Sequence, residues 1–181
     1  MGANKLTMPL WGRPLIRHAV EAVIASRVTS IAVVTGNNAE DIQTALTGLT
    51  VKFAENKEYP KGLSTSLKCG LRALPDDCDG AVIMLGDMPL VTPRLIDGLI
   101  AAFNPEQGRA IVVPVRNGRR GNPVLWARRF FPEMLRLEGD KGAKSLLAKH
   151  PDQIHELEAE DDGPLIDVDT PQILAAIGGH E

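Results

Sequence analysis

The sequence is poor in aromatic residues and in cysteine, and it has no long uninterrupted hydrophobic run. Aromatic residues make up only 4% of the 181 residues, which argues against a nucleic-acid binder that stacks bases on aromatic side chains. The two cysteines, Cys69 and Cys78, have no second pair and no histidine cluster beside them, so we expect free thiols rather than a zinc site. Without a signal peptide or an apolar run of about 18 residues, we expect a soluble protein of the cytoplasm.

The excess of acidic over basic residues is also small. The formal net charge is −3 and acidic and basic residues are interspersed, so no basic face is offered to DNA, RNA or a membrane surface. We therefore expect neither nucleic acid nor membrane as a partner. A phosphate-bearing substrate would have to be attracted by a local site, because the overall field of the protein would not attract it.

What the chain does contain is aliphatic: hydrophobic residues make up 44% of it, and they recur in an alternation of strand and helix patterns. This alternation predicts a three-layer α/β fold with a mostly parallel sheet and a short antiparallel excursion, in one domain over residues 1–181. Strands are predicted at residues 30–36, 50–55, 80–86 and 109–115, a returning strand within 117–126, and weaker ones at 153–159 and 164–168. Helices are predicted at residues 13–26, 38–48, 64–74, 92–103, 127–137, 141–150 and 169–179.

The apolar content of each strand predicts its place in the sheet. Residues 80–86, "GAVIMLG", form the most apolar strand, and we expect it at the centre. Pro114 and Pro123 disfavour interior ladder positions, so we expect their segment at an edge or outside the main sheet. Ligands of open α/β sheets bind beyond the carboxyl ends of the strands, and that edge is where we expect the chemistry.

The first candidate stretch is residues 1–14, which carry Gly2 and Lys5 ahead of a helix. Backbone N–H groups of a glycine-bearing loop can approach a phosphate, and Lys5 would add a positive point charge. An ordinary chain terminus with a surface lysine explains the same residues, since the pattern is not a Walker A loop.

The second candidate stretch is residues 55–70. Gly62 precedes Ser64, Thr65 and Ser66 at the predicted start of a helix. The free N–H groups of the first helical turn, with three hydroxyls, could bind a base or a phosphate. The alternative is a plain capping motif in which Ser64 bonds only the first turn.

Two aspartates follow predicted strands at the expected ligand edge. Asp87 follows the most apolar strand, and Asp169 ends the segment "LIDVD", with Asp167 two residues earlier. Mg²⁺ is often held by one or two carboxylates together with substrate phosphates, so Asp87 and Asp169 are the candidate metal ligands. A turn before Pro89 explains Asp87 equally well, and an N-cap of the last helix explains Asp169.

Two polar turns complete the set of candidates. Gly121, Asn122 and Pro123 form the first, and Asp140 and Lys141 lie in the second, between glycines. Either turn could accept a second substrate, and either could be an ordinary surface turn.

Six short motifs occur together in one order: "MG-x-x-K" with "PL-x-G-x-P", then "GLSTSL", "GDMPLV", "GNPVL", "GDKGAKSLL" and "DVDTP". In this order they resemble the MobA-like nucleotidyltransferase family of molybdenum cofactor biosynthesis, and within it the cytidylyltransferase branch. The resemblance covers nearly the whole chain. It implies a Rossmann-like fold that binds a nucleoside triphosphate with Mg²⁺ and transfers CMP from CTP to a molybdopterin-type cofactor.

The same resemblance assigns roles to the candidate residues. It implies that Lys5 contacts the triphosphate, with Gly2 beside it, and that Asp87 holds the metal, with Asp169 as the weaker second contact. Lys5 and Asp87 would then be the catalytic residues. It further places Gly62 and Ser66 near base and ribose, and it turns Gly121, Asn122, Pro123, Asp140 and Lys141 towards the pterin substrate.

One departure from the family pattern leads to a further expectation. The family signature begins with a strand and a loop of the type "LAAGxSxR", whereas this sequence opens at Met1 and Gly2, where that motif would be ending. We expect a preceding segment that supplies this strand, rather than a shortened protein of doubtful activity.

Three other functions fit the same residues. They are a guanylyltransferase that uses GTP, a nicotinamide-dependent oxidoreductase relative, and a non-enzymatic chaperone that carries the pterin cofactor to a molybdenum enzyme as its client. No "GxGxxG" motif follows a strand in the sequence to favour the second of these.

Overall fold

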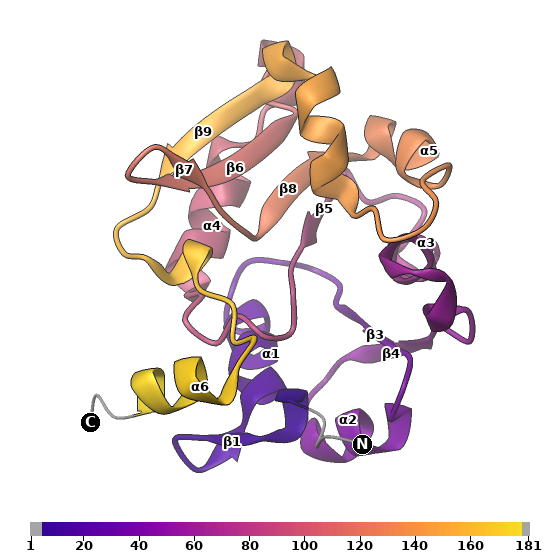
Figure 1. Cartoon of the computed structure of the whole chain (residues 1–181). Helices are drawn as coiled ribbons and strands as arrows, with labels where there is room; N and C mark the ends of the chain where they lie inside the picture. Colours follow the sequence, from indigo (N-terminus) through magenta and orange to yellow (C-terminus); the bar gives the residue numbers. More distant parts are fainter. Residues whose placement is uncertain (1–4, 179–181) are drawn as a thin grey trace.

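The fold alternates strands and helices, as the sequence predicts, in a computed structural model that describes residues 5–178 (Figure 1). The strands are β1 (Pro9–Leu10), β2 (Arg13–Pro14), β3 (Ala32–Thr35), β4 (Lys52–Glu55), β5 (Gly80–Ile83), β6 (Ile111–Arg116), β7 (Arg119–Arg120), β8 (Val124–Ala127) and β9 (Ile154–Glu158). The helices are α1 (Leu15–Ile24), α2 (Ala39–Ala45), α3 (Leu63–Ala73), α4 (Pro93–Ala102), α5 (Phe131–Met134) and α6 (Pro171–Gly178). Seven 3₁₀ turns join them, of which η1 (Lys5–Thr7), η5 (Ala143–Lys149) and η7 (Gly163–Leu165) bear on the site.

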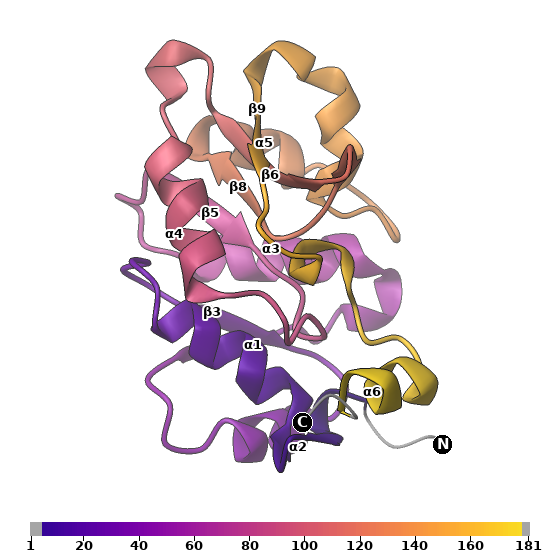
Figure 2. The same ribbon diagram turned by 90° about the vertical axis from the view of Figure 1, so that its left-hand side faces the viewer.

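Helices cover both faces of the strands, which gives three layers. Helix α4 packs against β6, β8 and β9, and α3 packs against β3 and β4. Figure 2 shows α4 and α3 on opposite sides of β5 and β8. The α/β class and the Rossmann-like arrangement are therefore confirmed.

The pairing of the strands is less parallel than the alternation of strands and helices predicts. The ladders β3·β4 and β6·β9 are parallel, whereas β1·β2, β5·β8, β6·β7 and β6·β8 are antiparallel. The physical reason is the returning strand β8, which lies between β5 and β6 and runs against both. The antiparallel excursion is thus part of the larger sheet.

The expected positions of two strands within the sheet are wrong. Strand β5 ends the ladder β5-β8-β6-β7, and β6, which pairs with β7, β8 and β9, occupies the centre. Pro114 is tolerated inside β6 because its side of the strand faces the bend between β7 and β8, where its carbonyl oxygen accepts a hydrogen bond from Gly121 N at 2.8 Å. Gly121 lies outside the strands there, between β7 and β8, so the missing N–H of Pro114 interrupts no β6 pairing with the named strands β8 and β9.

Five of the predicted helices are confirmed, as α1, α2, α3, α4 and α6. Helix α4 begins after Thr92, whose hydroxyl accepts a hydrogen bond from Leu95 N at 3.2 Å, with Pro93 in its first turn. Residues 127–137 form only a 3₁₀ turn followed by the short α5, and residues 141–150 form the 3₁₀ helix η5. The predicted strand at 164–168 is instead η7 followed by extended chain, whereas β9 is confirmed.

The core is aliphatic around one tryptophan. Trp126 of β8 and Leu99 of α4 are both 0% exposed, and Ile111 and Val112 of β6 are equally buried. Burying this apolar area is the main driving force for folding. Among residues 5–178, no helix has the length and apolar character needed to cross a membrane.

Truncating this core should be costly. Replacing Leu99 by Ala should lower the free energy of unfolding in urea by about 2–5 kcal/mol, because it leaves a cavity against Val112 and Leu125. The control is Ile24→Ala in α1, where the side chain is 38% exposed and the loss should be about 1 kcal/mol or less. Equal losses in the two variants would contradict this view of the core.

Candidate functional site

Three charged side chains from remote parts of the chain meet beyond the end of β5. The Lys5 ammonium donates hydrogen bonds to Asp87 Oδ2 and to Asp169 Oδ1, each at 2.7 Å. Lys5 belongs to η1, Asp87 lies in the loop after β5, and Asp169 precedes α6. Asp87 and Asp169, predicted at the strand edge, and Lys5, predicted ahead of the first helix, are thus in direct contact.

Backbone contacts and apolar packing hold this meeting point. Val168 N donates a hydrogen bond to the Asp87 carbonyl oxygen at 2.9 Å. Val168 is 2% exposed and packs with Leu10 and Leu15, so the side chains of its neighbours Asp167 and Asp169 are carried towards the loop after β5. The buried Val168 anchors the segment, and the aspartates on either side of it remain able to contact other groups.

The cluster is asymmetric in its exposure to solvent. The Asp87 side chain is only 14% exposed, whereas those of Lys5 and Asp169 are 42% and 60% exposed. Asp87 Oδ1 is buried and accepts no hydrogen bond within the described part of the chain. A buried carboxylate oxygen without a partner is unfavourable. Asp87 Oδ1 could therefore gain stability by accepting a hydrogen bond or by binding a cation.

The contacts of the cluster shift the pKa values of Lys5, Asp167 and Asp169. Burial opposes the charged form of Lys5, but hydrogen bonds to Asp169 and Asp87 outweigh it and raise the Lys5 pKa above 10.5. The hydrogen bond from Lys5 is the main reason that the Asp169 pKa lies below its usual 3.8. Burial, followed by a hydrogen bond shared with Asp169, raises the pKa of Asp167. The cluster therefore holds its ammonium and the Asp169 carboxylate in charged form.

This donor set fits a divalent cation of the magnesium type. Two carboxylates already converge on one positive charge, and a third oxygen, Asp87 Oδ1, has no partner. Within residues 5–178 no group of three or more His, Cys, Asp or Glu side chains is arranged to hold a metal unaided. Mg²⁺ is commonly held by one or two carboxylates, with water and phosphate oxygens completing its shell.

Within residues 55–70, the second predicted stretch, the hydroxyls of Thr65 and Ser66 are held by a residue that the sequence analysis did not single out. Asn56, which follows β4, is 5% exposed and its side-chain amide donates to Thr65 Oγ1 at 2.9 Å and to Ser66 Oγ at 3.0 Å. Its backbone N–H donates to the Thr35 carbonyl oxygen at 2.7 Å. A polar residue directly after a strand was the available signal, since Asn56 follows β4 as Asp87 follows β5.

Thr35, at the end of β3, was also missed. It is 2% exposed, and its hydroxyl has no hydrogen-bond partner among the described residues. It lines a cavity of about 240 Å³ that also reaches Leu6 of η1 and the loop after β3. The cavity lies at the carboxyl end of the strand, where ligands of this architecture bind.

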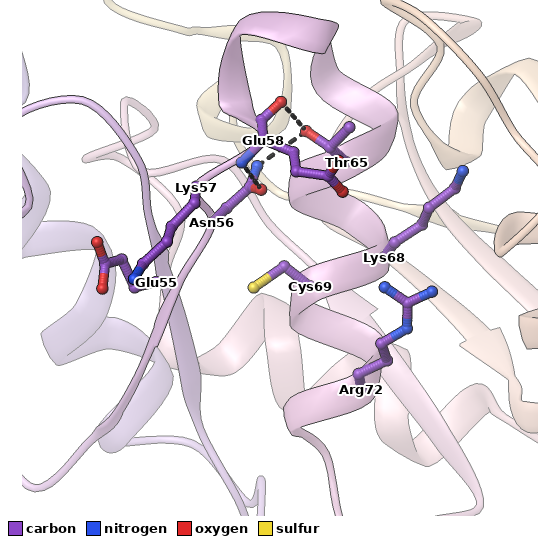
Figure 3. A pocket seen from close by; sticks show the side chains of 8 residues that line it. All are labelled: Glu55, Asn56, Lys57, Glu58, Thr65, Lys68, Cys69 and Arg72. Atoms are coloured by element: carbon purple, nitrogen blue, oxygen red, sulfur yellow. Dashed lines mark hydrogen bonds between the residues drawn. The ribbon is translucent and has the colours of Figure 1, made fainter.

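A second cavity, of about 330 Å³, lies between α3 and the chain that follows β4 (Figure 3). Asn56 and Thr65 stand together at one end of it, and Cys69, Lys68 and Arg72 follow along α3. Burial raises the pKa of the Cys69 thiol, while the nearby Arg72 cation acts in the opposite direction. The cavity therefore lies beside the Thr65 hydroxyl, and Lys68 and Arg72 offer two cations to a ligand there.

The start of α3 is not free, contrary to expectation. Leu63 N donates to Asp140 Oδ1 at 3.2 Å, and Ser64 N donates to the Gly139 carbonyl oxygen at 3.0 Å. The Ser64 side chain makes no capping hydrogen bond, and the N-cap residue is Gly62. These two N–H groups are thus occupied by the second polar turn, 77 residues further along the chain.

The first polar turn is packed against η7. Asn122 N donates to the Pro164 carbonyl oxygen at 2.9 Å, and a Cβ atom on Gly121 would lie 2.7 Å from Pro164 Cβ. Gly121 and Pro123 are buried, while Asn122 is half-buried. This turn contacts the segment that leads into Asp167 and Asp169. Gly2 lies outside the described residues.

The charge contacts of Lys5 generate a prediction about protonation. In Lys5→Met the pKa of Asp169 should rise towards 3.8, because the cation that favours the carboxylate is gone. The stabilisation that Asp169 gains from Lys5 is present above pH 3.8 and is lost as the pH falls through its lowered pKa. Lys5→Met should therefore have a lower free energy of unfolding than the wild type at neutral pH. On acidification through the Asp169 pKa, this free energy should fall less in the variant than in the wild type.

A carbon-13 NMR titration of the Asp169 carboxyl measures this pKa. Lys149→Met is the control, because Lys149 pairs with Glu133 elsewhere in the fold and its removal should leave Asp169 unchanged. An Asp169 pKa in Lys5→Met equal to that of the wild type would contradict the assigned contact.

Comparison with known proteins agrees with this architecture. The Bacillus subtilis purine catabolism protein PucB is 28% identical over 183 residues, covering 95% of this chain and 86% of PucB. The bifunctional protein GlmU of Agrobacterium fabrum is 34% identical over 96 residues, which are 52% of this chain. The chain spans about a fifth of the length of GlmU, 21%.

Solved structures share the fold over nearly the whole chain. A nucleotidyl transferase from Methanothermobacter thermautotroptrophicus, Mth528, superposes with a TM-score of 0.85 at 26% identity, covering 98% of this chain and 85% of that one. Rv0371c of Mycobacterium tuberculosis, in a complex with manganese, superposes with a TM-score of 0.83 at 23% identity, covering 98% and 92%.

The family assignment comes from most of the sequence. The model of the MobA-like NTP transferase domain matches residues 1–154, which include Lys5, Asp87, Gly62 and the turn at Asp140. The chain belongs to the MobA-like NTP transferase family.

Proposed function

We propose that this nucleotidyltransferase moves CMP from CTP to the phosphate of a molybdopterin-type cofactor and releases pyrophosphate. The observation that carries the proposal is the convergence of Asp87 and Asp169 on the Lys5 ammonium, in a chain of the MobA-like NTP transferase family. CTP and the pterin come from the order of the sequence motifs.

The charges of the cluster explain why a divalent cation is part of the proposal. One ammonium and two carboxylates leave the site with a net negative charge, which repels a triphosphate. Asp87 and Asp169 would hold Mg²⁺, which supplies positive charge to neutralise the phosphate oxygens. Lys5 would then give up its carboxylate partners and donate to the phosphates.

The reaction itself asks little of the protein in acid–base chemistry. An oxygen of the acceptor phosphate, already anionic at neutral pH, attacks the α-phosphorus of the triphosphate. A new P–O bond forms there as the bond to the oxygen that bridges the α- and β-phosphorus breaks, and pyrophosphate leaves with the bonding electrons. The protein contributes alignment and charge, and Lys5 offsets the charge that develops on the leaving pyrophosphate.

Pyrophosphate release tests the proposal directly. The full-length protein is given CTP, GTP, ATP or UTP, each with and without molybdopterin, in the presence of Mg²⁺. Release should require molybdopterin and CTP together. Release with GTP in place of CTP would make the protein a guanylyltransferase, and no release from any triphosphate would contradict nucleotidyl transfer.

The role of Asp87 makes a separate prediction. Asp87→Asn should lower turnover by about 100-fold or more, because an amide neutralises no charge at the metal position. The fold should persist, because Val168 still bonds the backbone of residue 87 and Lys5 still bonds Asp169. Circular dichroism checks the fold, and Asp152→Asn, at an exposed position, is the matched control. Near-normal turnover would remove Asp87 from the mechanism.

A further inference from the structure

The first turn of α3 is capped by a segment that lies far away in sequence. The N–H groups that open a helix have no partner within it, and a side chain at the N-cap position usually satisfies one of them. Here the N-cap is Gly62, which has no side chain, and Asp140 Oδ1 accepts from Leu63 N at 3.2 Å instead. The Gly139 carbonyl oxygen accepts from Ser64 N at 3.0 Å. One turn thus satisfies two N–H groups.

The two segments fit closely, and the contact requires glycine at residue 62. Gly62 has φ +107°, a conformation that favours glycine, and a Cβ atom there would lie 2.8 Å from Asp140 N and closer still to the Gly139 carbonyl group. A Cβ atom on Gly142 would lie 3.1 Å from Leu63 Cδ2. Backbone therefore meets backbone along this contact, and a displacement of either segment would be transmitted to the other.

Asn56 also holds this stretch of α3. The Asn56 amide holds the hydroxyls of Thr65 and Ser66, while Asp140 holds the turn just before them. Two side chains, Asn56 and Asp140, therefore set the position of the segment from Gly62 to Ser66, which we propose to lie against the base and ribose. Of these two, Asp140 is exposed and Asn56 is buried, so Asp140 can be replaced without opening the core.

We propose that Asp140 is a positioning residue for the nucleotide-binding segment around Gly62 and Ser66, and not a ligand of the acceptor substrate. The role is that of an acceptor atom: Oδ1 fixes the first N–H group of α3, and its negative charge is favourable at a helix N-terminus. The inference rests on the proposed nucleotidyl transfer, and it revises the expectation that Asp140 faces the pterin.

Two substitutions separate the two roles. Asn keeps an oxygen in the place of Asp140 Oδ1 and is as good an N-cap as Asp, whereas Ala removes the acceptor. A positioning residue therefore tolerates Asp140→Asn and not Asp140→Ala. A carboxylate that bound the acceptor through its charge would be impaired about equally by both substitutions.

The first measurement does not depend on any reaction. Amide hydrogen exchange across residues 62–66 should be about five- to tenfold faster in Asp140→Ala, as expected for loss of a helix cap, and within about twofold of wild type in Asp140→Asn. Glu138→Gln, at an exposed position in the same loop, should leave exchange unchanged. Unchanged exchange in Asp140→Ala would show that Asp140 does not hold the helix start.

The second measurement uses the triphosphate that supports pyrophosphate release, or Mg-CTP if none does. In Asp140→Ala its affinity by calorimetry should fall about five- to tenfold, from the same lost cap. KM for the triphosphate should rise by a similar factor, with kcat and the KM for molybdopterin nearly unchanged. Asp140→Asn should keep the affinity of the wild type. A general loss of stability at this position would not explain such a difference between the Asn and Ala variants.

The outcomes distinguish this inference from the function on which it rests. A raised KM for molybdopterin in both variants, with triphosphate affinity intact, would return Asp140 to the acceptor site and overturn the positioning role. Wild-type protein that binds no triphosphate would contradict the proposed function and, with it, this role, even if the exchange data confirm the cap.

Discussion

One ammonium shared by two carboxylates ties together the parts of the chain on which the site depends. The contacts of Lys5 with Asp87 and Asp169 span 82 and 164 residues of sequence. Two carboxylates brought this close would repel each other without a cation between them. The Lys5 ammonium at their meeting point offsets this repulsion, and the backbone hydrogen bond from Val168 N to the Asp87 carbonyl oxygen joins the same two segments.

The residues around this contact hold its carboxylates in place. Val168 buries its side chain between the two aspartates of its segment and bonds the backbone of Asp87, so the carboxylates are presented by rigid chain. The start of α3, which we propose to lie against the base and ribose, is held by Asn56 and by the turn at Asp140. Residues that need not touch a ligand thus hold both the charged cluster and this helix start in place.

Much of this arrangement could be predicted from the sequence, because it depends on local patterns. Asp87 and Asp169 could be placed at a ligand edge because each follows an extended segment, and parallel α/β proteins bind ligands at that edge. The cap at Thr92 and the periodicity of α4 could be predicted for the same reason, since a helix start requires residues adjacent in sequence. The strand predicted at 164–168 failed because its apolar residues pack without a ladder partner.

What could not be predicted depends on which remote segments meet. The cap that Asp140 provides for α3 joins residues 77 apart, and no periodicity in either segment indicates it. Pro114 lies in the central strand because the bend at Gly121 faces it, a circumstance decided by the return of β8. The two prolines predicted an edge position or a place outside the main sheet, because a proline in the sequence does not reveal which side of its strand lacks a partner.

The most direct measurement is a crystal structure with Mn²⁺ and a non-hydrolysable CTP analogue, with the ion located by anomalous scattering. The account predicts an ion bound by Asp87 and Asp169, with the Lys5 ammonium moved from the carboxylates to the phosphates. An ion bound elsewhere, with Lys5 still hydrogen-bonded to both aspartates beside the bound nucleotide, would contradict it.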